Sequence, residues 1–210
     1  MLRIVQVGVA LALLLAGCAW PARETTQLAP TDIPGVDLTG TGPGSVIEAK
    51  SMPEIGRPIT TLGATAVRVV YRSTSGIDGS PTEVSGAVFV PSGRPPAGGW
   101  PVIAFAHGTS GIREECGPTL SPDLMGATGL IRTYLKLGFA VAATDYQGLG
   151  HPGGHPYLDA KTAGLNIIDS VRALRAVFPN ISSTWAAFGG SQGGAATWAA
   201  NEQAGTYAKE

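Results

Sequence analysis

The ten-residue stretch WAAFGGSQGG, residues 185–194, decides the fold of this chain. Its first four residues are apolar and predict a strand, whereas residues 192–205 have the pattern of a helix. Gly189 to Gly193 fit G-x-S-x-G between these two elements, which is where a nucleophile elbow places its serine. Glycine on both sides of Ser191 leaves room for a tight, strained turn, and the helix N-terminus favours developing negative charge. The stretch therefore predicts a nucleophilic Ser191; the plain alternative is a glycine-rich turn whose serine has no chemical role.

Alternating strand and helix patterns extend upstream from this turn. Alternating apolar residues predict a hairpin over 65–90, and uninterrupted apolar runs are typical of strands covered on both faces. The expected strands are 67–71, 84–90, 102–106, 139–144 and 185–188. Apolar residues recurring every three or four positions predict helices at 123–137, 160–178 and 192–205. This order predicts an α/β fold, with an N-terminal hairpin and then parallel strands with helices on both faces of the sheet.

Composition narrows the class of protein. The chain has 210 residues, of which 44% are apolar, so it can bury a core in one domain. Its 14 basic and 15 acidic residues give a net charge of −1, and a nucleic-acid binder would show a basic stripe instead. Two widely separated cysteines provide neither a disulfide scaffold nor a metal cluster. We therefore expect no metal, no cofactor and no nucleic-acid partner.

The N-terminus has the pattern of an export signal. Arg3 precedes an apolar run over residues 4–15, which is too short to span a bilayer and is typical of a signal peptide. The run ends in Leu-Ala-Gly-Cys18, which resembles the bacterial lipobox, where the cysteine is lipidated and becomes the first mature residue. The alternative is an ordinary secretory signal in which Cys18 is incidental. Residues 1–17 are thus predicted to be a lipoprotein signal, and the mature chain is predicted to be anchored on the outer face of a bacterial cell membrane.

Two segments follow the signal. Residues 18–60 contain six prolines among Thr, Gly and Asp, so we expect a tether and an irregular lead-in. Residues 61–210 contain the strand and helix patterns and are expected to form the folded domain.

A second loop complements the predicted elbow. His107–Gly111 follows the strand 102–106 directly. In α/β-hydrolases such a loop supplies one backbone N–H to the oxyanion hole, and the residue after the nucleophile supplies the other. Here those donors are Thr109 and Gln192; the alternative is a plain glycine loop.

A third loop, Asp145–Gly150, ends the strand 139–144. We expect Asp145 to brace this turn rather than to take part in catalysis. His151 and His155 follow at H-x3-H spacing, but they lie in a proline-glycine loop with no third ligand nearby. This spacing therefore does not predict a metal site.

Together these segments resemble the secretory lipase family of α/β-hydrolases, from about Gly44 to the end of the chain. The resemblance rests on the HGT loop at His107–Thr109, the D-Y-x-G-L-G loop at Asp145–Gly150 and the G-G-S-Q-G-G elbow at Gly189–Gly194. It implies a carboxylic-ester hydrolase that acts on acylglycerols, other lipid esters or short-chain esters, with Ser191 as the nucleophile. Family members often carry a cysteine after the HGT loop in a disulfide. Cys116 stands there but has no mature partner in this sequence.

The order of the catalytic groups creates a difficulty. In this fold the acid and then the histidine follow the serine along the chain. After Ser191 the sequence contains neither Asp nor His, only Glu202 and Glu210. We therefore expect 61–210 to be a truncated α/β-hydrolase domain that lacks its C-terminal strands and its triad acid and base. The 210 residues would then be inactive, with 184–188 as an exposed sheet edge; His107 stays open as a substitute base.

Two other functions stay open. One is a non-catalytic, lipid-anchored lipoprotein that keeps a hydrolase-like pocket for an acyl ligand. The other keeps the fold but changes the reaction to peptide cleavage or to acyl transfer between alcohols, because all of these use the same serine chemistry. The sequence indicates no particular protein partner.

Overall fold

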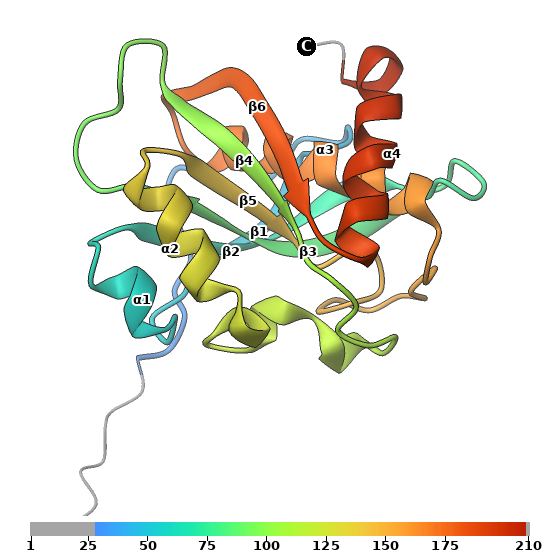
Figure 1. Ribbon diagram of the computed structural model, residues 1–210, viewed down its shortest axis with the longest axis horizontal. Helices are drawn as coiled ribbons and strands as arrows, with labels where there is room; N and C mark the ends of the chain where they lie inside the picture. Colours follow the sequence, from blue (N-terminus) through green and yellow to red (C-terminus); the bar gives the residue numbers. More distant parts are fainter. Residues whose placement is uncertain (1–27, 209–210) are drawn as a thin grey trace, which may run out of the picture.

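A single mixed sheet forms the centre of the protein (Figure 1). The computed structural model describes residues 28–208, so the predicted signal peptide and Cys18 lie outside the described residues. The sheet has six strands in the order β1-β2-β3-β5-β4-β6. Their bounds are β1 Val46–Ser51, β2 Thr65–Thr74, β3 Pro81–Val90, β4 Trp100–Ala106, β5 Ala140–Thr144 and β6 Ile181–Gly189.

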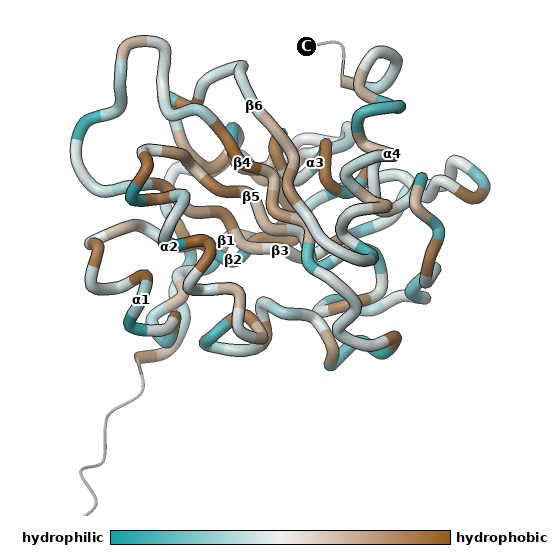
Figure 2. The backbone as a smooth tube through the Cα atoms, in the orientation of Figure 1, coloured by the Kyte–Doolittle hydropathy of each residue, from teal (hydrophilic) through white to brown (hydrophobic). Residues whose placement is uncertain are grey.

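Helices cover both faces of this sheet, as predicted. They are α1 Arg57–Thr60, α2 Thr128–Lys136, α3 Ala160–Val177 and α4 Gln192–Tyr207. One core lies under α3 and α4, where Ile167 and Leu174 pack with Ala104 and Ala142. The second core lies under α1 and α2 and includes Ile131. In Figure 1, α2 lies in front of the sheet and α3 behind it, and Figure 2 shows apolar residues concentrated along the central strands.

The strand pairing brings the three predicted loops together at the carboxyl ends of the central strands. β2 and β3 form the expected antiparallel hairpin, with Thr65 opposite Val90. β4 runs parallel to β5 on one side and to β6 on the other. Ala106, the last residue of β4, pairs with Thr144 of β5 and with Gly189 of β6. Because these strands are parallel and in register, the loops that follow them emerge side by side.

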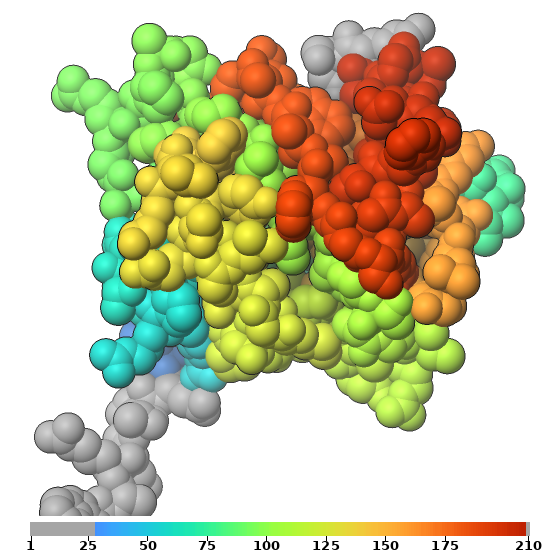
Figure 3. Space-filling view, in the orientation of Figure 1, coloured from blue at the N-terminus to red at the C-terminus, as the bar shows by residue number. Residues whose placement is uncertain are grey.

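β6 is the outermost strand on the side of the sheet opposite β1, which confirms the expected exposed edge. Phe188 on this strand is 46% exposed, and Trp198 on the adjoining α4 is 72% exposed. The space-filling view shows β6 and α4, in orange to red, uncovered across this side of the molecule (Figure 3). Nothing else among the described residues lies beyond β6 in the sheet.

Two local features differ from the sequence-based expectation. Residues 46–51, expected within an irregular lead-in, form β1, because Val46 and Ala49 are buried against the edge of β2. The helix expected at 123–137 begins only at Thr128. Leu124 and Met125 have φ values of 53° and 51°, in the left-handed region, and the Asp123 carboxylate accepts the Met125 N–H at 3.0 Å. This aspartate-centred turn competes with the first helical turn.

Within residues 28–208, no helix combines the length and the apolarity needed to cross a bilayer.

Candidate active site

Ser191 stands on a sharp turn between β6 and α4. β6 ends at Gly189 and α4 begins at Gln192, so the turn has room for little more than the serine. The backbone of Ser191 has φ 55° and ψ −123°, which a residue with a Cβ rarely adopts. Ser191 is exposed and is the N-cap residue of α4. The hydroxyl therefore lies at the positive end of a 16-residue helix, as a nucleophile elbow requires.

The flanking glycines let this turn pack against the end of β4. A Cβ added to Gly189 would lie 2.6 Å from the carbonyl oxygens of Ala106 and Gly193. A Cβ added to Gly193 would overlap the carbonyl of Ala106 and lie 2.8 Å from the carbonyl of His107. Only glycine fits at either position without moving the backbone.

The loop after β4 lies directly against the elbow. A Cβ placed on Gly108 would be 3.5 Å from the Gly190 carbonyl and 3.8 Å from the Ser191 Cβ. The first N–H groups of a helix have no partner inside it, which leaves the Gln192 amide free for a ligand. Among the described residues, neither the Gln192 nor the Thr109 backbone N–H donates a hydrogen bond. Two N–H groups that donate no hydrogen bond among the described residues therefore lie on the elbow turn and on the HGT loop beside it.

His107 is held by the backbone rather than by the serine. Its ring is buried, with Nδ1 2.6 Å from the Gly108 carbonyl and Nε2 3.1 Å from the Asp145 carbonyl. The Tyr146 hydroxyl donates to the His107 carbonyl at 3.0 Å. These contacts tie the loop after β4 to the loop after β5 and leave neither ring nitrogen directed at Ser191.

Asp145 braces its turn, which confirms the predicted structural role. Its carboxylate is fully buried and accepts the Ser85 hydroxyl at 2.6 Å and the Thr119 N–H at 2.9 Å. The Thr119 hydroxyl donates to the same carboxylate. Asp145 thereby connects β3, the end of β5 and the segment that follows the HGT loop.

The other two histidines have separate partners. His151 Nε2 lies 3.3 Å from the Glu83 carboxylate. His155 Nδ1 lies 2.8 Å from the Gln147 carbonyl, and its Nε2 lies 3.2 Å from the side-chain nitrogen of Gln192. Burial lowers the pKa of His155 below its ordinary value of 6.5. Within residues 28–208 there is no cluster of three or more side chains that could hold a metal.

The contact between His155 and Gln192 was not expected from the sequence. The H-x3-H spacing of His151 and His155 relates the two histidines to metal binding only. No local pattern shows that the loop after β5 folds back onto the elbow, so only the structure identifies this contact.

A groove adjoins the HGT loop. It encloses about 440 Å³, and its polar lining includes Thr109 and Ser110. Its apolar wall includes Leu124, Met125 and Leu130. Apart from His107, its lining in the described part of the chain has no acidic or basic side chain. The groove can therefore hold an apolar group beside Thr109.

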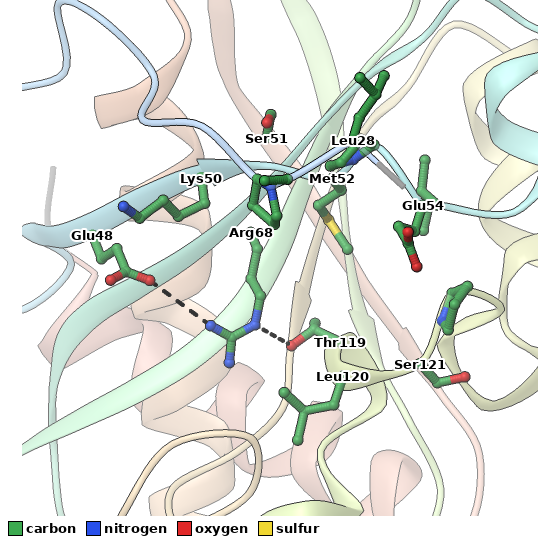
Figure 4. Close-up of a pocket in the computed structure, with 15 residues that line it drawn as sticks. Leu28, Glu48, Lys50, Ser51, Met52, Glu54, Arg68, Thr119, Leu120 and Ser121 are labelled. Carbon is green, nitrogen blue, oxygen red and sulfur yellow. Dashed lines mark hydrogen bonds and ion pairs between the residues drawn. The ribbon is translucent and has the colours of Figure 1, made fainter. Parts of the chain in front are cut away.

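A larger hollow lies elsewhere, between the lead-in, β1 and residues 119–122 (Figure 4). It encloses about 630 Å³. In it the Arg68 guanidinium donates to the Thr119 hydroxyl at 3.1 Å and lies 4.0 Å from the Glu48 carboxylate. It includes neither the elbow nor the HGT loop, so size alone does not mark the reactive site.

Residues 124–210 match the family model of the secretory lipases. This secretory lipase match contains the elbow and the Asp145 turn but begins after the HGT loop at His107–Thr109. No curated protein sequence matches the chain significantly.

Solved structures agree on the fold. Lipase A of Candida antarctica superposes with a TM-score of 0.68 at 18% identity, over 81% of this chain and 40% of the lipase. A rice cell wall degrading esterase, LipA of Xanthomonas oryzae, has a TM-score of 0.66 at 24% identity, over 81% and 48%. A putative hydrolase of Legionella pneumophila has a TM-score of 0.63 at 22% identity, over 78% and 49%. The chain thus has the α/β-hydrolase type of fold and spans less than half the length of these structures.

Proposed function

We propose that this chain carries the nucleophile and the oxyanion hole of a carboxylic-ester hydrolase that acts on lipid esters or short-chain esters. The observation that carries the proposal is the backbone of Ser191, because a φ of 55° at a serine is strained and needs a reason. The secretory lipase match and the free N–H groups of Thr109 and Gln192 support the same chemistry.

In the proposed reaction Ser191 Oγ attacks the ester carbonyl while its proton passes to a general base. The carbonyl oxygen becomes an oxyanion and accepts hydrogen bonds from the N–H groups of Thr109 and Gln192. The partial positive charge at the N-terminus of α4 also stabilises this oxyanion. The base then protonates the alcohol as the carbon–oxygen bond breaks, which leaves an acyl-serine. Water, deprotonated by the same base, hydrolyses the acyl-serine and restores the hydroxyl.

The general base does not come from the three histidines of this chain. His107, His151 and His155 each face other partners, and none forms a hydrogen bond with Ser191. We propose that a histidine and a carboxylate that are not among these 210 residues complete the triad, and that the 210-residue chain alone is close to inactive. Loss of the histidine in a comparable serine hydrolase lowers kcat about 10⁶-fold.

The groove beside Thr109 supports an apolar acyl or alcohol group in the substrate. It lies next to a proposed oxyanion donor, and Met125 and Leu130 form part of its apolar wall. A lipid ester would place its polar carbonyl at Ser191 and an apolar arm along this wall.

We further propose that the mature chain is exported and anchored by lipid on Cys18, on the outer face of the bacterial cell membrane. The secretory lipase match supports export, and the apolar run before Leu-Ala-Gly-Cys18 supports the anchor. Such an anchor would hold the site close to lipid substrates without a membrane-spanning helix.

A second candidate is a non-catalytic lipoprotein that binds an acyl ligand in the same groove. The observation that favours it is that no histidine forms a hydrogen bond with Ser191 among the described residues. It predicts binding of a fatty acid with no chemical change.

Covalent labelling separates the two functions. We expect a fluorophosphonate probe to label Ser191 slowly and S191A to lose the label. S183A, which replaces an exposed serine on the preceding strand β6, should keep the label. Hydrolysis of p-nitrophenyl butyrate should be barely above background in all three. Labelling that persists in S191A would overturn the assignment of the nucleophile. No labelling together with saturable binding of a fluorescent fatty acid would favour the binding protein.

A further inference from the structure

The loop after β5 touches both proposed oxyanion donors, although it contributes no oxyanion donor of its own. His155 contacts the side chain of Gln192 at 3.2 Å, and the Tyr157 hydroxyl lies 3.1 Å from the hydroxyl of Thr109. Residues 155–157 therefore bridge the two loops that flank Ser191.

We propose that His155, in its neutral form, is a positioning residue that holds Gln192 and with it the oxyanion-binding turn, while Tyr157 holds Thr109. This inference rests on the proposed function, because it gives the 155–157 segment a purpose only if Gln192 and Thr109 bind an oxyanion.

Hydrogen-bond chemistry sets the tautomer of His155. The carbonyl of Gln147 can only accept, so the Nδ1 atom that lies 2.8 Å away carries the proton. Nε2 of the neutral ring then has a lone pair and accepts one N–H of the Gln192 side-chain amide. The orientation of the Gln192 amide follows from the same logic, since its oxygen could not face an acceptor.

Gln192 depends on this contact. The residue is only 7% exposed, and its side-chain oxygen is buried without a hydrogen-bond partner among the described residues. His155 thus provides the side-chain anchor of the residue that follows Ser191. Losing it would leave a buried amide unpaired at both ends and free to turn.

The ring of His155 is itself well supported. The rings of Tyr146 and Tyr157 lie near it, at centroid distances of 6.4 and 6.1 Å. Gly148, with φ 74°, lets the backbone pass so close to His155 that a Cβ on Gly148 would overlap the His155 N atom. The loop therefore presents a fixed acceptor to the elbow.

Protonation would release this contact. A proton on Nε2 replaces the lone pair with a donor. The Nε2–H of His155 and the side-chain N–H of Gln192 would then face each other, and no hydrogen bond could form between them. The ionisable groups around the ring are His107, Tyr146 and Tyr157. Burial lowers the pKa of His155, and the electrostatic influence of His107 acts in the same direction, so the contact persists at neutral pH and is lost only in more acidic solution.

The test is an NMR titration of the whole 210-residue chain. We expect the His155 ring to be the neutral Nδ1–H tautomer at pH 7.5. The side-chain and backbone N–H signals of Gln192 should shift with the same midpoint as His155, below the ordinary 6.5. The control is the H151Q variant, which replaces a ring whose Nε2 faces the Glu83 carboxylate and should leave the Gln192 transition unchanged. An Nε2–H tautomer of His155 would overturn the proposal, and so would Gln192 signals that do not change as His155 titrates.

Two variants separate positioning from general packing. H155N keeps a donor for the Gln147 carbonyl but is too short to reach Gln192, whereas H155Q can still accept the Gln192 N–H. We expect H155N to shift the Gln192 signals at pH 7.5 and to abolish their change in acid. H155Q should change the chemical shifts of Gln192 at pH 7.5 less than H155N does. Unchanged Gln192 signals in H155N would contradict the role of His155. If H155N does not fold, the titration of the unmodified chain still tests whether His155 holds Gln192. These signals do not depend on catalysis, whereas failure of the proposed function appears as loss of Ser191 labelling.

Tyr157 is tested in the same way. Y157F removes only the hydroxyl that contacts Thr109, so the fold and the Gln192 signals should stay unchanged while the Thr109 backbone N–H signal shifts. A Thr109 signal identical to that of the unmodified chain would remove Tyr157 from the proposal.

Discussion

Gly108 lies against Ser191 across two neighbouring loops, such that a Cβ on Gly108 would be 3.8 Å from the Ser191 Cβ. This closeness exists because β4 and β6 are parallel neighbours whose last residues, Ala106 and Gly189, pair in register. The elbow and the HGT loop therefore form one unit, and glycines keep them in contact.

Gly193→Ala should destabilise the fold by about 1–3 kcal/mol, because the new methyl group overlaps the backbone carbonyl of Ala106. The matched control is Gly190→Ala, since a Cβ at Gly190 meets nothing within 4 Å. Urea unfolding followed by circular dichroism measures both free energies of unfolding. Equal stability of the two variants would show that the elbow can move away from β4.

Ser191→Gly should stabilise the fold by about 1–3 kcal/mol, because glycine adopts the backbone of this turn without strain. Ser191→Ala should show no such gain, since alanine keeps the Cβ. The comparison of these two unfolding free energies isolates strain from the loss of the hydroxyl. A glycine variant no more stable than the alanine variant would mean that the turn is relaxed in solution.

Asp145→Ala should cost about 3 kcal/mol of unfolding free energy, because it leaves the Ser85 hydroxyl and the Thr119 N–H buried without an acceptor. Asp145→Asn retains one acceptor oxygen and should cost less. Thermal unfolding of both variants checks the order. A milder effect for alanine than for asparagine would contradict the bracing role.

Asp169 should make stability depend on pH in an unusual direction. Burial raises the pKa of this carboxyl above 3.8, although it accepts the hydroxyls of Ser73 and Tyr207 and pairs with Arg172. A raised native pKa means that the native state binds the proton more tightly than the unfolded chain does. Its contribution is therefore fully present below pH 3.8 and declines as the pH rises through the native pKa.

The measurement compares Asp169→Asn with the unmodified chain from pH 3 upwards. Because asparagine does not titrate, the stability of the unmodified chain relative to the variant should fall across that window. A relative stability that rises with pH would mean that Arg172 outweighs burial and holds the pKa below 3.8.

Met125→Asp should weaken binding of a fluorescent fatty acid at least tenfold, because it places a charge in the apolar wall of the groove. The fold should tolerate the change, since Met125 is 48% exposed and aspartate accepts the left-handed backbone better than most residues. Leu137→Asp, at an exposed position outside the groove lining, is the control and should leave binding unchanged. Equal binding by all three proteins would place the apolar group elsewhere.

Much of the site could be predicted from local sequence. The elbow, the HGT loop and the Asp145 turn are each encoded within a few residues, because a strand, a glycine turn and a helix start are local choices of the backbone. Strands 102–106, 139–144 and 185–188 were expected because buried parallel strands are continuously apolar. Their order in the sheet, with β4 between β5 and β6, required the structure.

Other features depended on distant partners. β1 lies in a segment whose prolines predict irregular chain, and it forms because the edge of β2 offers hydrogen-bond partners to Val46–Ser51. The late start of α2 depends on the left-handed turn at Leu124 and Met125, which helical periodicity does not reveal.

The sequence by itself determined where a strained serine would stand and which backbone amides could flank it, because glycine spacing controls the backbone directly. Only the tertiary structure decided what surrounds that serine. His155 and Gln192 are 37 residues apart and meet because the loop after β5 folds back over the elbow. Contacts of this kind arise from the packing of whole elements, so no short stretch of sequence contains them.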